Sequence, residues 1–179
     1  IMQGYFTLLT ETLSQNKEIW PTHIFMQAGV GSLAAAILAY LCSYIDKPSP
    51  VFVLVEARGA PCFFKSMEIG DGNPHTVHGD LKTIMAGLAC GKPSQTAWDI
   101  LKQGANVFAV CDDEVAKKGM RILGNPMEND SRIISGESGA VTLGLVYYLL
   151  CDKKYAHFKT RLNLDADSKI LLFSTEGDT

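Results

Sequence analysis

A glycine-rich turn is the feature of this sequence with the clearest chemical potential. In "IFMQAGVGSLAAAIL" an apolar run ends at Gly29-Val30-Gly31, and small residues typical of a helix follow. The segment "GVGSLA" fits the pattern G-x-G-x-x-[GA] between a predicted strand and a predicted helix. In that setting backbone N–H groups and a helix N-terminus can face an anion, and glycine lets the backbone approach it closely. The pattern predicts phosphate binding, and a tight turn without a ligand is the alternative.

Two kinds of cofactor carry such a phosphate. A dinucleotide such as NAD is indicated by the same pattern together with Glu56 at the end of the next strand, although this acid lies beyond the usual offset of about 20 residues. A second polar turn, "FSTEGD", favours another cofactor. Ligands of open parallel sheets bind beyond the carboxyl ends of the strands. The predicted strands end at Gly29, Glu56, Cys111 and Ser174. A phosphate at residues 29–32 and an aromatic nitrogen at Ser174 could therefore belong to one flat cofactor.

The elements that must position these turns alternate between strands and helices. Apolar runs predict buried strands at 22–29, 51–57, 106–112 and 169–175. Periodicity and capping residues predict helices at 2–15, 32 to about 45, 60–70, 94–104, 112–124 and 137–150. The stretch 71–80 is rich in turn formers and is predicted to be a loop. The alternation, with strands apolar on both faces, predicts an α/β domain with a mostly parallel sheet.

Composition excludes several classes of protein. The 179 residues are 47% hydrophobic and 20% charged with a net charge of −3, which is typical of one soluble domain or part of a larger one. The absence of a basic stripe argues against nucleic acid as a partner, and no apolar run reaches transmembrane length.

The five cysteines are scattered and form no C-x-x-C motif, so we expect no zinc site. We expect buried thiols in a cytoplasmic protein, with a Cys62–Cys90 disulfide as the less favoured alternative. The first residue, Ile1, and the uncovered final strand lead us to expect a fragment of a longer protein.

Several longer motifs resemble one enzyme family over essentially the whole chain. They are "IMQGY", "QAGVGS", "VEARGAPCFFKS", "GDLKTIMAGLACGKPS", "GNPMENDSRIISGESGAVTLG" and "FSTEGDT". They resemble the C-terminal part of the diaminopropionate ammonia-lyase family, which belongs to the tryptophan-synthase-β-like, fold type II pyridoxal-phosphate enzymes. The resemblance implies a three-layer αβα fold with a mostly parallel sheet and pyridoxal 5'-phosphate as cofactor. It also implies a homodimer that converts 2,3-diaminopropionate to pyruvate and two molecules of ammonia by α,β-elimination.

The resemblance also implies roles for individual residues. The backbone of the glycine turn would bind the cofactor phosphate, through Gln27, Ala28, Gly29, Val30, Gly31 and Ser32. Ser174, with Thr175 beside it, would meet the pyridine nitrogen, and Glu137 would lie near the ring or its 3-hydroxyl. The family's Schiff-base lysine and its acid–base aspartates lie upstream of the matching region, so residues 1–179 would be the C-terminal part of the large cofactor-binding domain and inactive alone. Lys65 in "FFK" imitates the lysine motif, but a surface lysine on a short helix is the expected role.

Other conspicuous residues have simpler explanations. His75 and His78 form H-x-x-H, but they lie in the predicted loop without an obvious third ligand, so no metal site is predicted. Helix capping accounts for Asp112, Asp113 and Glu114, and a core position is expected for Trp98. Two alternatives to the lyase stay open from sequence. One is an NAD-type dinucleotide-binding domain, and the other is a non-catalytic regulatory or scaffold fragment.

Overall fold

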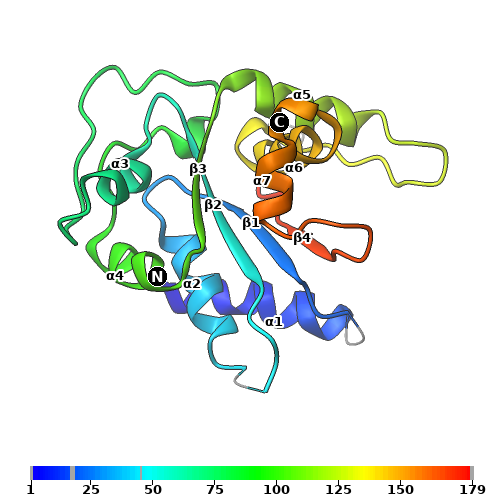
Figure 1. Cartoon of the computed structure of the whole chain (residues 1–179), viewed down its shortest axis with the longest axis horizontal. Coiled ribbons are helices and arrows are strands. Elements are labelled where there is room, and N and C mark those ends of the chain that lie inside the picture. Colours follow the sequence, from blue (N-terminus) through cyan, green and yellow to red (C-terminus); the bar gives the residue numbers. More distant parts are fainter. Residues whose placement is uncertain (1, 17–18, 45, 178–179) are drawn as a thin grey trace.

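Four parallel strands form the centre of the molecule. The computed structural model describes residues 2–16, 19–44 and 46–177. Its strands are β1 (His23–Gln27), β2 (Val51–Ala57), β3 (Val107–Cys111) and β4 (Ile170–Leu172). They lie side by side in the order β3-β2-β1-β4, and every pairing among them is parallel (Figure 1). The prediction of an α/β domain with a mostly parallel sheet is confirmed.

Helices cover both faces of this sheet. One face packs against α1 (Phe6–Gln15), α2 (Ser32–Leu41), α3 (Cys62–Ile69) and α4 (Gln95–Gly104). The other face packs against α5 (Asp113–Gly124), α6 (Glu137–Cys151) and the segment around α7 (Ala156–Arg161). Short 3-10 turns are η1 (Met2–Tyr5), η2 (Ala86–Leu88) and η3 (Lys153–Tyr155). The expected three-layer αβα arrangement is confirmed.

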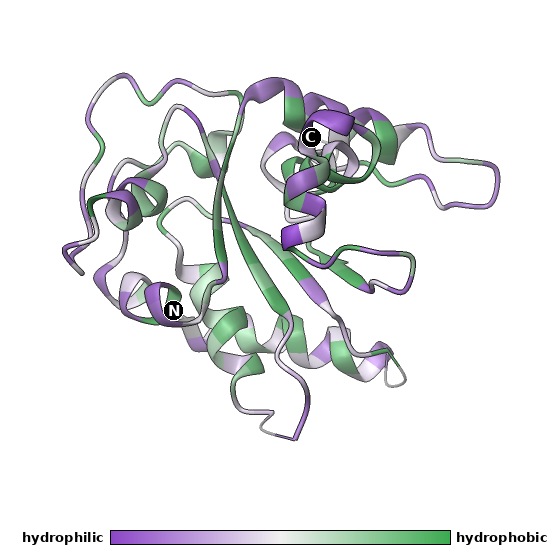
Figure 2. Ribbon diagram, viewed as in Figure 1, coloured by the Kyte–Doolittle hydropathy of each residue, from purple (hydrophilic) through white to green (hydrophobic). Residues whose placement is uncertain are grey.

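Alternation along the strands divides the core into two halves. Ile24 and Met26 of β1 point to the side of α2 and α4, whereas Phe25 points to the side of α6. All five residues of β1 are buried because this strand lies inside the sheet with helices above and below. Hydrophobic residues accordingly line the strands and the inner helix faces, while hydrophilic residues occupy outer surfaces (Figure 2). Among the residues that the structure describes, no helix is long and apolar enough to cross a membrane.

Helix ends follow the predicted signals with one exception. Ser94 caps α4 by accepting a hydrogen bond from the N–H of Ala97, and Gly70 ends α3 with a left-handed φ of 72°. The exception is α5, where Asp112 occupies the N-cap but its side chain makes no capping bond. Its carboxylate pairs instead with the guanidinium of Arg58, so helix capping does not account for this acid.

The structure also fixes how far the predicted elements extend. Helix α2 ends at Leu41 and β4 spans only three residues, so both are shorter than predicted. Ile45, at the predicted end of the second helix, lies outside the described residues, as do Asp178 and Thr179 of the last motif.

Candidate functional site

The glycine turn joins β1 to α2 at the carboxyl edge of the sheet. Gly31 occupies the N-cap of α2 with a φ of 87°, a conformation that residues with a Cβ rarely adopt. The N–H groups of Gly29, Val30 and Gly31 have no hydrogen-bond acceptor among the residues that the structure describes. They lie at the positive end of the helix dipole, so the turn can bind an anion such as phosphate.

A cleft opens directly over this turn. It is lined by residues of the turn and of three other segments: Tyr5, Gln27, Ala28, Gly29, Val30, Gly31, Ser32, Leu33, Ala34, Gly87, Leu88, Ser138, Thr175 and Glu176. Its volume of about 190 Å³ exceeds the roughly 30 Å³ that one liquid water occupies, so a phosphate group has room. A larger cleft between α1 and β4 lies by Pro21 and Lys169, at the opposite end of the strands. The first cleft is the candidate site, because ligands of parallel sheets bind at the carboxyl edge.

Gln27 connects the two predicted turns. Its Nε2 donates to the carbonyl of Phe173 at 2.9 Å and to Oγ1 of Thr175 at 3.1 Å. Its Oε1 is buried and has no hydrogen-bond partner among the described residues. A buried acceptor of this kind normally has a partner, so a ligand with a donor group fits the site. The turn, the unpartnered Gln27 oxygen and the nearby hydroxyls suit a cofactor that carries both a phosphate and polar ring atoms, as pyridoxal phosphate does.

The first turn of α6 completes the site from the other layer. The carboxylate of Glu176 accepts from the N–H of Ser138 at 2.9 Å, and the Ser138 hydroxyl accepts from the N–H of Gly87 at 3.1 Å. Gly87, Ser138 and Glu176 were not predicted as site residues. All three lie inside the quoted motifs, but 51 and 38 positions separate the partners of these two bonds, so local sequence patterns could not connect them.

The predicted site residues fall into two groups in space. Residues 27–32 and Thr175 line the cleft together. Ser174 lies beside it and donates to Oγ of Ser135 at 2.9 Å. Glu137 occupies the first turn of α6 but is not among the lining residues, whereas its neighbour Ser138 is. The roles given to Ser174 and Glu137 stay predictions.

Glu56 is the acid on which the dinucleotide alternative depended. Its side chain is fully buried at the end of β2, and its carboxylate accepts from the N–H groups of Phe63 at 2.8 Å and Phe64 at 2.6 Å. Burial raises the pKa of Glu56 to about 7, although these amide bonds favour its ionised form. A carboxylate closed off in this way cannot reach a ribose hydroxyl, so the structure removes the support for NAD.

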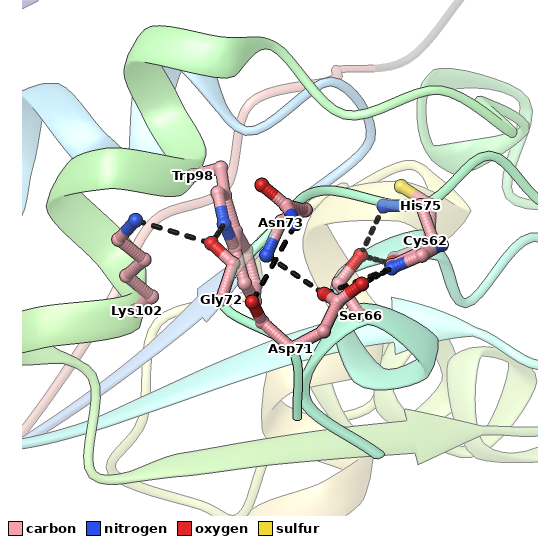
Figure 3. A network of polar contacts seen from close by, with 8 residues as sticks. All are labelled: Cys62, Ser66, Asp71, Gly72, Asn73, His75, Trp98 and Lys102. Carbon is pink, nitrogen blue, oxygen red and sulfur yellow. Dashed lines mark hydrogen bonds and ion pairs between the residues drawn. The ribbon is translucent and has the colours of Figure 1, made fainter. Parts of the chain in front are cut away.

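The loop after α3 holds His75 and His78, and Figure 3 shows the contacts of His75. His75 Nε2 lies 3.0 Å from the carboxylate of Asp71, and the His75 N–H donates to the Ser66 hydroxyl at 2.7 Å. The indole of Trp98, buried as predicted, donates to the Gly72 carbonyl at 2.9 Å and fixes the loop on α4. These contacts give the loop a structural role.

Lys65, Cys62 and Cys90, which the sequence analysis singled out, are not among the residues that line the cleft. Lys65 pairs with Glu68 at 2.6 Å on the exposed side of α3, which confirms the expected surface position. All five cysteines are free, so Cys62 and Cys90 form no disulfide. The prediction of buried thiols is confirmed for Cys62 and Cys111 but is wrong for Cys42 and Cys151, which are exposed, and Cys90 is partly exposed. Burial raises the pKa of the Cys62 thiol and keeps it protonated.

We expect the buried Glu56 carboxyl to make stability depend on pH. Because burial raises its pKa from 4.5 to about 7, the folded state binds more protons than the unfolded state between these values. Its contribution is therefore fully present below pH 4.5 and is lost as the pH rises through 7. The unfolding free energy of the wild type minus that of Glu56→Gln should fall by about 3 kcal/mol over this range.

Urea unfolding at several pH values measures this difference, with Glu68→Gln as the matched control on the exposed face of α3. A difference that is constant with pH would contradict the expectation.

Comparison with known proteins identifies the family and the fold. Residues 1–157 match the family model described as "Pyridoxal-phosphate dependent enzyme". The whole chain is 45% identical to the diaminopropionate ammonia-lyase of Salmonella typhimurium and covers 45% of that protein. In the crystal structure of the Escherichia coli diaminopropionate ammonia lyase with an aminoacrylate–PLP azomethine reaction intermediate, 45% of the protein superposes on 99% of this chain, with a TM-score of 0.89 and 43% identity. The complex of that enzyme with D-serine gives a TM-score of 0.88 at 42% identity, with 99% of this chain and 44% of that one covered.

These similarities confirm the resemblance found in the sequence, the fold type II architecture and the cofactor expected from it. The chain spans about 45% of the length of the relatives it matches.

Proposed function

Because this chain belongs to the family of pyridoxal-phosphate dependent enzymes, we propose that it is the C-terminal, cofactor-holding part of a diaminopropionate ammonia-lyase. The complete enzyme would convert 2,3-diaminopropionate to pyruvate and two molecules of ammonia. The observation that carries the proposal is 45% identity over the whole chain to an enzyme of that name. The cleft supports it, because both cofactor turns named from sequence open onto one space.

Each part of the cleft has a task in this proposal. The free N–H groups of residues 29–31 and the start of α2 bind the cofactor phosphate. The Ser174 hydroxyl, with Thr175 beside it, would meet the pyridine nitrogen, and Glu137 would lie near the ring or its 3-hydroxyl. A hydroxyl leaves that nitrogen weakly protonated, which suits β-elimination. The bound cofactor supplies the electron sink, and the protein supplies orientation and proton transfer.

No lysine lines the cleft among the residues that the structure describes. Lys65, the candidate in the sequence, is paired with Glu68 outside the cleft lining. We propose that the Schiff-base lysine and the acid–base aspartates lie in the upstream part of the complete protein. Residues 1–179 alone would then have no lyase activity.

The absorbance spectrum of the full-length protein tests the function directly. We expect a visible band from bound pyridoxal phosphate, a change of this band on addition of 2,3-diaminopropionate, and release of pyruvate and ammonia. L-Serine is the control for substrate choice. A colourless protein, or a coloured one that releases no pyruvate from diaminopropionate, would refute the proposal.

Ser32→Asp should separate the phosphate-binding role of the turn from its structural role. A carboxylate in the first turn of α2 would stabilise the helix by about 0.3–1 kcal/mol through its dipole. The same charge would repel the cofactor phosphate, so affinity for pyridoxal phosphate should fall at least tenfold. Thermal unfolding of the apo-protein and titration with the cofactor measure the two effects, and Ser32→Asn is the uncharged control. Unchanged cofactor affinity in Ser32→Asp would contradict phosphate binding here.

We also propose that the enzyme is a cytoplasmic homodimer. All five cysteines are free, which suits a reducing compartment. Exposed apolar side chains on the α5–α7 side, at Met127, Leu150 and Phe158, offer surface for a second copy. Sedimentation velocity of the full-length protein tests the dimer.

A further inference from the structure

Glu56 makes contacts that lead from the centre of the sheet to the glycine turn. Its side chain has an exposed fraction of 0%, and its two carboxylate oxygens accept from the N–H groups of Phe63 and Phe64 in the first turn of α3. The residue at the N-cap of α3, Pro61, supplies no capping side chain of its own. Glu56 therefore fixes where this helix begins, from a strand adjacent to the one that ends in the turn.

The first turn of α3 in turn contacts both glycines of the turn. The ring of Phe63 packs so closely on Gly31 that a Cβ added there would lie 2.9 Å from Cε2 of the ring. The Cys62 thiol approaches the carbonyl of Gly29 at 3.8 Å. Phe63 therefore contacts the turn with its ring and donates its N–H to Glu56. Cys62, which also contacts the turn, is the residue before it.

The far end of α3 is fixed by other groups. Ser66 donates to the Cys62 carbonyl at 2.6 Å and accepts from the N–H of His75, and Trp98 holds the following loop (Figure 3). Removing the Glu56 contacts should therefore loosen the start of α3, beside the glycine turn, without releasing the whole helix.

From these contacts we infer that Glu56 is a positioning residue, which holds the glycine turn in its phosphate-binding shape through the first turn of α3. The inference rests on the proposed function, because it assumes that the turn binds the phosphate of pyridoxal phosphate. Glu56 is not among the residues that line the cleft. Its carboxylate binds the start of α3, where Phe63 and Cys62 contact the glycines of the turn.

The test compares two ligands that differ only in the phosphate. Dissociation constants of pyridoxal phosphate and of pyridoxal are measured on the full-length apo-protein at pH 8.5, for the wild type and Glu56→Gln. A glutamine amide offers one acceptor where the carboxylate offers two, and its NH₂ group opposes an N–H of α3. We expect about tenfold weaker binding of pyridoxal phosphate and unchanged binding of pyridoxal.

Control variants distinguish positioning of the glycine turn by Glu56 from a general loss of structure. Asp112→Asn makes the same carboxylate-to-amide change at the end of β3, where the carboxylate pairs with Arg58 rather than α3, and should change neither constant. Phe63→Leu removes the ring from Gly31 but keeps the Glu56 bonds, and should lower the preference for the phosphate-bearing ligand even where Glu56→Gln does not fold. Equal weakening of both ligands, or no change in either variant, would overturn the inference. A wild type that shows no preference for pyridoxal phosphate would instead overturn the proposed function.

Discussion

Gly31→Ala should abolish tight binding of pyridoxal phosphate and lower the free energy of unfolding by about 3 kcal/mol. The backbone at Gly31 has a φ of 87°, which costs an alanine about 1–2 kcal/mol. The new methyl group would also overlap the Phe63 ring and lie 3.1 Å from Cβ of Ala97. Either the turn or α3 must move, and the N–H groups of residues 29–31 would no longer converge on the phosphate.

A second glycine separates strain from overlap. Gly72 has a similar φ of 82°, but a Cβ there meets no atom within 4 Å. Gly72→Ala should therefore cost only the 1–2 kcal/mol of backbone strain and leave cofactor affinity unchanged. Chemical denaturation gives the unfolding free energies, and titration followed by absorbance gives the affinities. Equal behaviour of the two variants would mean that contact with Phe63 contributes nothing.

Elements with a strong local signal were predictable from sequence. Residues 51–57 form β2 as predicted, because a continuous apolar run bounded by turn formers suits a strand buried on both faces. Ser94 caps α4 for an equally local reason. The glycine turn is also local, since its conformation follows from Gly31 and its place between β1 and α2.

The rest of the site depends on contacts that no local pattern contains. A helix over 137–150 was predicted, but periodicity alone does not decide whether Glu137 or Ser138 faces the cleft. The structure puts Ser138 there, with Gly87 and Glu176 as its partners. Asp113 was attributed to helix capping from its place in the first turn of α5. Its carboxylate instead accepts from the Thr83 hydroxyl at 2.6 Å. In each case the partner is distant in sequence and becomes near only when the layers pack.

Gly119→Ala and Gly144→Ala should each destabilise the protein by about 3 kcal/mol, against the usual trend for helices. In an exposed helix such a change stabilises by up to about 1 kcal/mol, because alanine loses less backbone entropy than glycine. Here α5 and α6 touch backbone to backbone. A Cβ at Gly119 would lie 2.8 Å from the carbonyl carbon of Ala140, and one at Gly144 would lie 2.8 Å from that of Val115. Neither neighbour is a flexible side chain, so the helices must separate.

Gly124→Ala is the matched control, because it makes the same change in α5 where a Cβ would meet no atom within 4 Å. It should leave stability within about 0.5 kcal/mol of the wild type. Urea unfolding of the three variants measures the effects. Gly119→Ala and Gly144→Ala variants as stable as Gly124→Ala would contradict direct contact between the two helix backbones.

The double variant gives the sharper result, because one separation of the helices relieves both overlaps. Once α5 and α6 have moved apart for a methyl group at Gly119, the methyl group at Gly144 enters space that has already opened. We therefore expect the double variant to be less destabilised than the sum of the single variants by at least 1 kcal/mol. The separation should also shift Ser138, in the first turn of α6, away from the Glu176 carboxylate that accepts its N–H, so cofactor affinity should fall in parallel with stability. Additive destabilisation with unchanged affinity would mean that the two glycines relieve independent contacts and that the helix pair does not set the geometry of the cleft.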